Sequence, residues 1–95
     1  MFVTLAFHHP HPEHLDDFAA FRERVEDGMR GTDGLLSLES FRDAGSDDLV
    51  AIARWESAEH ARVGVQKLLS VGGRAADWSE RRDDLYRLIG LPQPE

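Results

Sequence analysis

The sequence contains no cysteine, which excludes disulfide bonds, thiolate metal sites and cysteine nucleophiles. It also has no asparagine, and only one lysine against ten arginines. Long apolar runs are missing as well, because no stretch approaches the ~18 residues of a membrane-spanning helix. The apolar run 2–7 is too short for a signal sequence and meets histidine and proline without a cationic lead. We therefore expect a cytoplasmic protein that does not engage a membrane.

Positive charge is scarce, since the formal net charge is −7 at pH 7. An acidic balance of this kind argues against a nucleic acid as partner. The length of 95 residues predicts one domain, which we place at residues 1–91, with a proline-containing tail at 92–95. A chain this short buries roughly 65% of its unfolded surface, so its core is thin.

The most informative stretch is LVAIARWES, residues 49–57. Its side chains alternate in a strand between two sets: Leu49, Ala51, Ala53 and Trp55 on one side, and Val50, Ile52 and Arg54 on the other. Both faces are largely apolar. In a thin domain the chain's own helices can cover one face, whereas the second face needs another copy or a different partner.

The remaining elements follow from periodicity, turn residues and caps. Ser57 has the residue type of a helix N-cap, and the polar run 43–48 is typical of a turn between antiparallel strands. We predict strands at 2–8, 35–42 and 85–91, helices at 12–30 and 57–69, and a short helix within 74–81. The resulting β-α-β-β-α-β order indicates an α+β, ferredoxin-like fold with a four-stranded antiparallel sheet.

The turn at 43–48 also suggests a strand register. If the paired residue numbers add up to 91, Glu39 lies opposite Ile52 and becomes a diagonal neighbour of Arg54 on the same face. Two interpretations stay open for Glu39 and Arg54: an ion pair within a subunit interface, or a polar site inside a barrel. A slip of one residue would separate them.

The element order, the segment DGLLSLE at 33–39 and the motif RWES at 54–57 resemble the antibiotic biosynthesis monooxygenase family. Its members are dimeric α+β barrels, so the resemblance implies a homodimer in which the uncovered sheet face packs against a second subunit. Val50, Ile52, Arg54 and Glu39 would then lie at the dimer interface. The resemblance also implies that Trp55 lines a pocket between sheet and helices.

The same resemblance bears on activity. The family contains cofactor-free oxygenases of quinol-like or polyketide-like aromatics as well as haem-degrading enzymes. Haem-degrading members carry a histidine where this chain has Gly64 or Val65, and a strand asparagine that is absent here. Some cofactor-free oxygenases use an asparagine near the position of Ala51. We therefore expect a cofactor-independent monooxygenase acting on a small aromatic, or alternatively a non-catalytic small-molecule-binding or stress-response dimer, or a purely structural one.

Individual residues carry further hypotheses. Trp55 either stacks on an aromatic substrate, with space left by Ala51 and Ala53, or is a core side chain. His60, in the first turn of the second helix, is either a general base or a solvated surface residue. Tyr86 would direct its hydroxyl into the pocket, or Arg87 would join the interface cluster, and the parity of their strand is open.

Four histidines and a glutamate crowd residues 8–14. Imidazole binds several transition metals, but adjacent strand residues point in opposite directions and two prolines stiffen the segment. We expect a solvated loop there and no resident metal. Trp78 is either a lid over the pocket or a plain surface contact.

Overall fold

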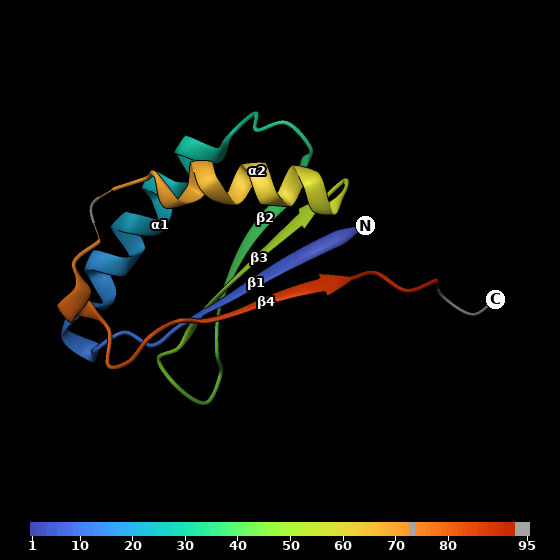
Figure 1. Cartoon of the computed structure of the whole chain (residues 1–95). Helices are drawn as coiled ribbons and strands as arrows, with labels where there is room; N and C mark the ends of the chain where they lie inside the picture. The colour runs from blue at the N-terminus through green and yellow to red at the C-terminus, as the bar shows by residue number, and fades with distance from the viewer. Residues whose placement is uncertain (73, 93–95) are drawn as a thin grey trace.

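The computed structural model describes residues 1–72 and 74–92 and shows a single sheet with helices on one side (Figure 1). Its elements are β1 (Phe2–His8), η1 (Pro12–His14), α1 (Leu15–Met29), β2 (Leu35–Arg42), β3 (Leu49–Trp55), α2 (Ala58–Leu69), η2 (Ala76–Trp78) and β4 (Asp84–Ile89). The strands lie in the order β2-β3-β1-β4, and every neighbouring pair is antiparallel. The predicted ferredoxin-like α+β fold is confirmed.

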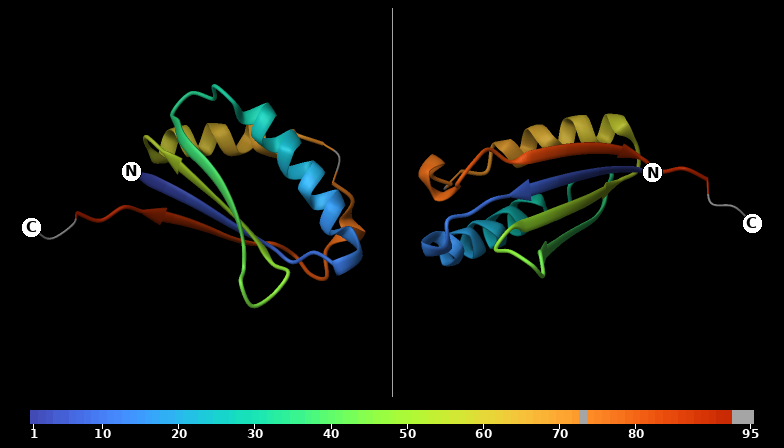
Figure 2. Two further views of the ribbon diagram at one scale, coloured as in Figure 1. Left: turned by 180° about the vertical axis from the view of Figure 1, so that it is seen from behind. Right: turned by 90° about the horizontal axis from the view of Figure 1, so that it is seen from below.

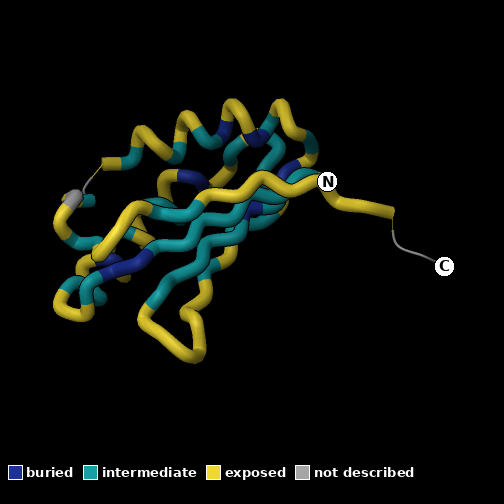
Figure 3. The backbone as a smooth tube through the Cα atoms, turned by 60° about the horizontal axis from the view of Figure 1, so that its bottom comes forward, coloured by how far each residue is buried: buried dark blue, intermediate teal, exposed yellow. Residues whose placement is uncertain are grey.

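Both helices lie on the same face of the sheet (Figures 1 and 2). Helix α2 packs on β1, β2 and β3, while α1 lies beside it. The opposite face, which we call the open face, is covered by no helix or strand of residues 1–72 and 74–92. Figure 3 shows that the edge strand β4 and the β2–β3 hairpin are mostly exposed, whereas the central strands are intermediate.

The register of β2 against β3 is the predicted one. Glu39 pairs with Ile52, and the backbone N–H of Asp43 donates to the carbonyl of Asp48 at 2.9 Å, which closes the hairpin. A bulge between Leu35 and Ser37 shifts the register only at the start of β2, away from the hairpin turn. Glu39 and Arg54 form the expected ion pair.

The core lies between the sheet and the helices. Alternation along β3 turns Ala53 and Trp55 toward the helices, where they are buried with Met29 and Ala61. Ser57 caps α2 as predicted, because its Oγ accepts a hydrogen bond from the backbone N–H of His60 at 3.1 Å.

The predicted first helix began three residues too early. Residues Pro12–His14 form a 3₁₀ turn, in which the N–H of His14 donates to the carbonyl of His11 at 2.9 Å, and α1 begins at Leu15. Strand β4 is also shorter than predicted. It ends at Ile89, and the N–H of Gly90 donates to the carbonyl of Met1 at 3.0 Å. Within the described residues, every helix is too short or too polar to cross a bilayer.

Candidate functional site

The Trp55 side chain is completely enclosed, with 0% of its surface exposed. Its indole Nε1–H donates to Thr4 Oγ1 on β1 at 3.1 Å. A Cβ atom built on Gly64 of α2 would lie 2.2 Å from Cζ3 and Cη2 of the ring, so the helix backbone rests directly on the indole. This is the geometry of a core tryptophan that satisfies its own polar atom.

Ala51 and Ala53 lie on the same side of the sheet as Trp55, as alternation predicts. Ala53 is buried opposite Thr4 of β1, and Ala51 is half-buried opposite Ala6. Small side chains at these positions let the helices approach the sheet. The substrate-binding role of the two alanines and of Trp55 stays a prediction.

His60 lies in a groove between α2 and the loop that joins α1 to β2. The groove has a volume of about 380 Å³ and is lined by Gly31, Thr32, Asp33, Glu59, His60, Val63, Gly64 and Lys67. The imidazole packs on Gly34, where a Cβ would lie 2.2 Å from the ring and where φ is +75°. Glycine at this position therefore suits both the turn and the close approach of the ring.

The polar contacts of His60 fix the direction of its ring. Nδ1 lies 2.7 Å from Oγ of Ser57, while Nε2 lies 3.6 Å from Asp33 Oδ2 and 3.8 Å from Glu56 Oε2. When Nδ1–H donates to the serine oxygen, the lone pair of Nε2 is available to accept a proton. In that tautomer Nε2 is a proton acceptor at the wall of the groove, and the role of His60 as a general base stays a prediction.

Lys67 is a groove residue that the sequence did not reveal. It lies two turns along α2 from His60, and its Nζ donates to Thr32 Oγ1 at 2.9 Å. Seven residues of helix span about 10.5 Å. The groove therefore combines an imidazole at one end with the ammonium group of the chain's single lysine at the other, and the spacing of residues 60 and 67 was the available clue.

Tyr86 faces away from Trp55, so its hydroxyl does not point to the tryptophan side of the sheet. Tyr86 pairs with Leu5, and its ring packs edge-on against Phe7 with centroids 5.8 Å apart. Both partners belong to the open face. Arg87 pairs with Thr4 and lies on the helix side, so it does not join the open-face residues, and the parity that the sequence left open is given by this register.

The open face carries apolar side chains of the central strands together with the Glu39–Arg54 ion pair. Val50 and Ile52 lie on it beside Phe7 and Leu5, which are their respective neighbours in β1. Large side chains on the outer strands are half-exposed, with 50% for Phe41. Exposed apolar surface of this extent on a small domain marks a contact surface.

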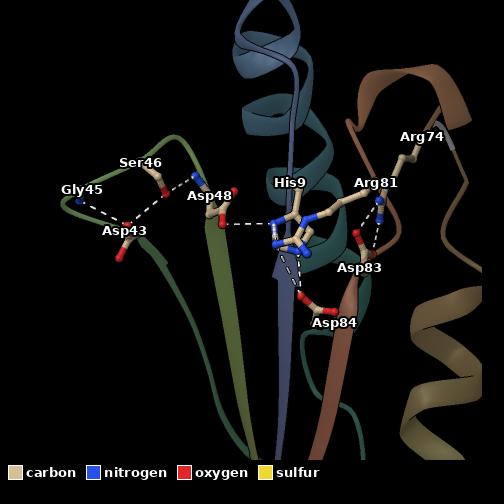
Figure 4. A network of polar contacts seen from close by, with 9 residues as sticks. All are labelled: His9, Asp43, Gly45, Ser46, Asp48, Arg74, Arg81, Asp83 and Asp84. Carbon is tan, nitrogen blue, oxygen red and sulfur yellow. Dashed lines mark hydrogen bonds and ion pairs between the residues drawn. The ribbon is translucent and has the colours of Figure 1, made fainter.

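The histidine segment is not a solvated loop. His9 is only 3% exposed, and its ring lies between two aspartates (Figure 4). Nδ1 is 3.0 Å from Asp48 Oδ2, and Nε2 is 2.9 Å from Asp84 Oδ2. Burial by itself lowers the pKa of His9, but the hydrogen bonds to the two carboxylates outweigh it and leave that pKa above its ordinary value. Residues 1–72 and 74–92 contain no group of three or more metal-ligating side chains.

A second charged cluster lies next to His9. Both Nη atoms of Arg74 bond the carboxylate of Asp83 at 2.7 Å, and Nδ1 of His8 lies 3.0 Å from the same carboxylate. Burial alone raises the pKa of Asp83, but the bonds to His8 and Arg74 hold it well below its usual range. A depression of about 480 Å³ opens beside it, lined by Arg74, Ala75, Ser79, Arg81 and Arg82.

Trp78 belongs to this end of the molecule. Its ring lies 5.8 Å from that of Phe18 and stacks on His14 at 6.0 Å. The guanidinium group of Arg74 lies over the ring of Phe18, 5.1 Å from its centroid, as a cation–π contact. Trp78 is thus part of the packing around Phe18, and the expectation of a lid over Trp55 has no support in these contacts.

Haem does not fit the helix-side space as the haem-degrading relatives would hold it. Gly64 and Val65 offer no imidazole, and a side chain at Gly64 would overlap the indole of Trp55. The strand that would supply the asparagine, β1, has none. We therefore derive no step through haem.

These elements and their order define a ferredoxin-like α+β protein. The antibiotic biosynthesis monooxygenase family model matches residues 1–63, which is more than half of the chain, and the protein belongs to that family. No curated protein sequence matches the chain significantly.

Solved structures share the fold at low sequence identity. Rv0793 from Mycobacterium tuberculosis superposes with a TM-score of 0.79 at 17% identity, covering 99% of this chain and 98% of that one. PA3566 from Pseudomonas aeruginosa gives 0.78 at 14% identity, covering 96% and 94%. A variant of MhuD, whose structure holds two manganese protoporphyrin IX molecules per active site, gives 0.79 at 13% identity, covering 100% and 99%. At these identities the likeness concerns the fold alone.

Proposed function

We propose that the protein is a homodimeric, cofactor-independent monooxygenase that acts on a small electron-rich aromatic such as an anthrone or a hydroquinone. Family membership supports the reaction class. The observation that carries the proposal is the groove that holds His60 at one end and Lys67 at the other. It provides a proton acceptor and a cation for the anion that proton removal creates.

The reaction balances without an external reductant. His60 Nε2 takes a phenolic or enolic proton, and the charge of Lys67 stabilises the aromatic anion. Dioxygen then adds to the electron-rich ring carbon to give a hydroperoxide. Loss of water breaks the O–O bond and leaves a carbonyl. One oxygen atom enters the quinone product, the other leaves as water, and the substrate supplies all the electrons.

The open face supports the homodimer. Ile52 and Val50 would be covered by the same surface of a second copy, and Glu39 with Arg54 would be enclosed near the centre of the contact. An isologous contact of this kind explains why a thin domain leaves one side of its sheet apolar.

Oxygen uptake with a panel of anthrones and naphthohydroquinones tests the reaction. We expect His60→Gln to remove the catalysed rate and Lys67→Met to reduce it by about 10²–10³-fold, the usual effect of losing one oxyanion partner. His11→Gln, an exposed histidine outside the groove, is the matched control. Uptake that is absent in the wild type, or that survives both groove substitutions, contradicts the proposal.

The enclosed indole favours a second candidate, a dimer that binds small molecules without turnover. Trp55 has no exposed surface for a substrate, so ligand contact would be limited to the His60 groove. A Trp78→Phe variant leaves Trp55 as the sole tryptophan reporter. Saturable fluorescence or calorimetric binding of the panel without oxygen uptake would select this candidate over the enzyme.

A further inference from the structure

We propose that His9 is a protonation-controlled clamp that fastens the segment 78–84 and the base of the β2–β3 hairpin to the end of β1. The ring reaches Asp48 at the start of β3 and Asp84 at the start of β4, which lie on either side of the chain end that carries it (Figure 4). The proposal concerns the fold and stands independently of the oxygenase reaction.

The two contacts require a proton on each ring nitrogen. A carboxylate only accepts hydrogen bonds, so Nδ1 and Nε2 must both donate, and only the imidazolium ion has two N–H groups. The neutral ring keeps a single donor. It would therefore leave one buried nitrogen facing a carboxylate oxygen at about 3 Å, lone pair against lone pair.

The surrounding charges agree with this assignment. Arg81 is the other cation beside the ring, with its Nη2 at 3.4 Å from Nδ1 of His9 and 3.9 Å from Oδ2 of Asp84. Imidazolium and guanidinium together neutralise Asp48 and Asp84. The neighbouring carboxylate of Asp83 is already matched by Arg74 and His8 and does not disturb the balance. Loss of the His9 proton leaves the cluster with one net negative charge.

The clamp holds a strap that is otherwise attached by few backbone bonds. The N–H of Glu80 donates to the carbonyl of His9 at 2.7 Å, and the N–H of His11 donates to the carbonyl of Trp78 at 2.8 Å. Pro10 and Ser79 form an isolated bridge between them. These contacts lie directly beside the ring, so weakening the clamp loosens the strap and the arginine-lined depression that the strap encloses.

The direction of the pH dependence follows from the raised pKa of His9. A group whose pKa is higher in the folded state contributes stability that is complete below its unfolded value, about 6.5 for histidine. The contribution is lost as pH rises through the folded-state pKa. The strap is therefore fastened below about pH 6.5 and loosens as pH rises through the folded-state pKa of His9.

Two measurements on the full chain test the clamp. Nitrogen NMR should show both ring nitrogens of His9 protonated at about pH 6, below the unfolded-state pKa of histidine. Amide hydrogen exchange, corrected for its intrinsic pH dependence, should show the protection of the Glu80 N–H falling as pH rises above about 6.5, by roughly tenfold for each unit by which the His9 pKa is raised. His9→Gln should remove this pH dependence, whereas the control His60→Gln, at a histidine outside this cluster, should retain it.

A neutral His9 ring at about pH 6 overturns the proposal, because a raised pKa keeps the ring protonated there. The same pH-dependent loss of Glu80 protection in His9→Gln overturns it as well. If His9→Gln does not fold, Asp48→Asn provides the second variant. It removes one charge that favours the imidazolium, so the fall in Glu80 protection should begin at lower pH than in the wild type. An unchanged midpoint in Asp48→Asn would equally refute the clamp.

Discussion

Replacing Gly64 by alanine is the sharpest test of how the core is built around Trp55. The new Cβ would lie 2.2 Å from two ring carbons, whereas ordinary contact begins near 3.4 Å, so ring and helix must separate by about 1.2 Å. The indole is enclosed on all sides, with 0% of its surface exposed, so it has no free space into which it could move. Overpacking of this kind costs about 1–3 kcal/mol.

Helix propensity acts in the opposite direction. Alanine is better than glycine inside a helix by about 1 kcal/mol, and Gly64 lies in the middle of α2. The difference predicts a net destabilisation of up to about 2 kcal/mol. For a domain of this length, at about 4–8 °C for each kcal/mol, that corresponds to a fall in Tm of up to roughly 8–16 °C.

Thermal unfolding followed by circular dichroism measures the effect, and Gly28→Ala is the matched control. Gly28 is also a helix residue, but its Cβ would meet only the end of the Val71 side chain, at 3.3 Å. We expect Gly28→Ala to be neutral or slightly stabilising. If Gly64→Ala instead raises Tm as much as the control does, the helix does not rest on the indole and a cavity beside Trp55 must exist.

Further predictions address the polar and open-face contacts. Thr4→Val keeps the side-chain shape but leaves the buried indole N–H without an acceptor, so unfolding in urea should show a loss of about 1–3 kcal/mol, which Thr4→Ser should largely restore. The stability advantage of wild type over Asp83→Asn should be complete above about pH 4 and should disappear as pH falls through the lowered pKa of Asp83, because a depressed carboxyl pKa stabilises only the ionised form. Ile52→Asp should convert the proposed dimer to monomer in analytical ultracentrifugation while Ser57→Thr leaves it intact, and a wild-type monomer would refute the interface.

Local patterns were sufficient for most of the fold. Strands β1 and β2 have the predicted bounds, and the cap at Ser57 and the hairpin register are confirmed. Each depends on alternation, on a capping hydroxyl or on a short turn, and these act between residues close in sequence. The ion pair of Glu39 with Arg54 could be predicted because it depends only on the strand register of the hairpin.

The features that the sequence left open or got wrong concern contacts between distant segments. The parity of Tyr86 depends on how β4 aligns with β1, a pairing across most of the chain. The burial of His9 depends on Asp84, which lies 75 residues away in the sequence. The closeness of Gly64 to the indole depends on how α2 seats on the sheet. Periodicity predicts which side chains share one face of a helix or strand, but it does not predict which distant side chains pack against that face.

The close contact between the His60 ring and the backbone of Gly34 has a consequence for ligand selection. The backbone of Gly34 lies against the imidazole, and its carbonyl accepts the N–H of Glu56 at 2.9 Å, so the loop after α1 is joined to the start of α2. The main chain at Gly34 thus fixes the imidazole from one side, whereas the rest of the groove is lined partly by side chains that can change rotamer, among them Asp33, Glu59 and Lys67. Under the proposed function, a substrate would meet a fixed ring at one end of the groove and adjustable side chains at the other, so selection should be strict beside the reacting oxygen and loose further away.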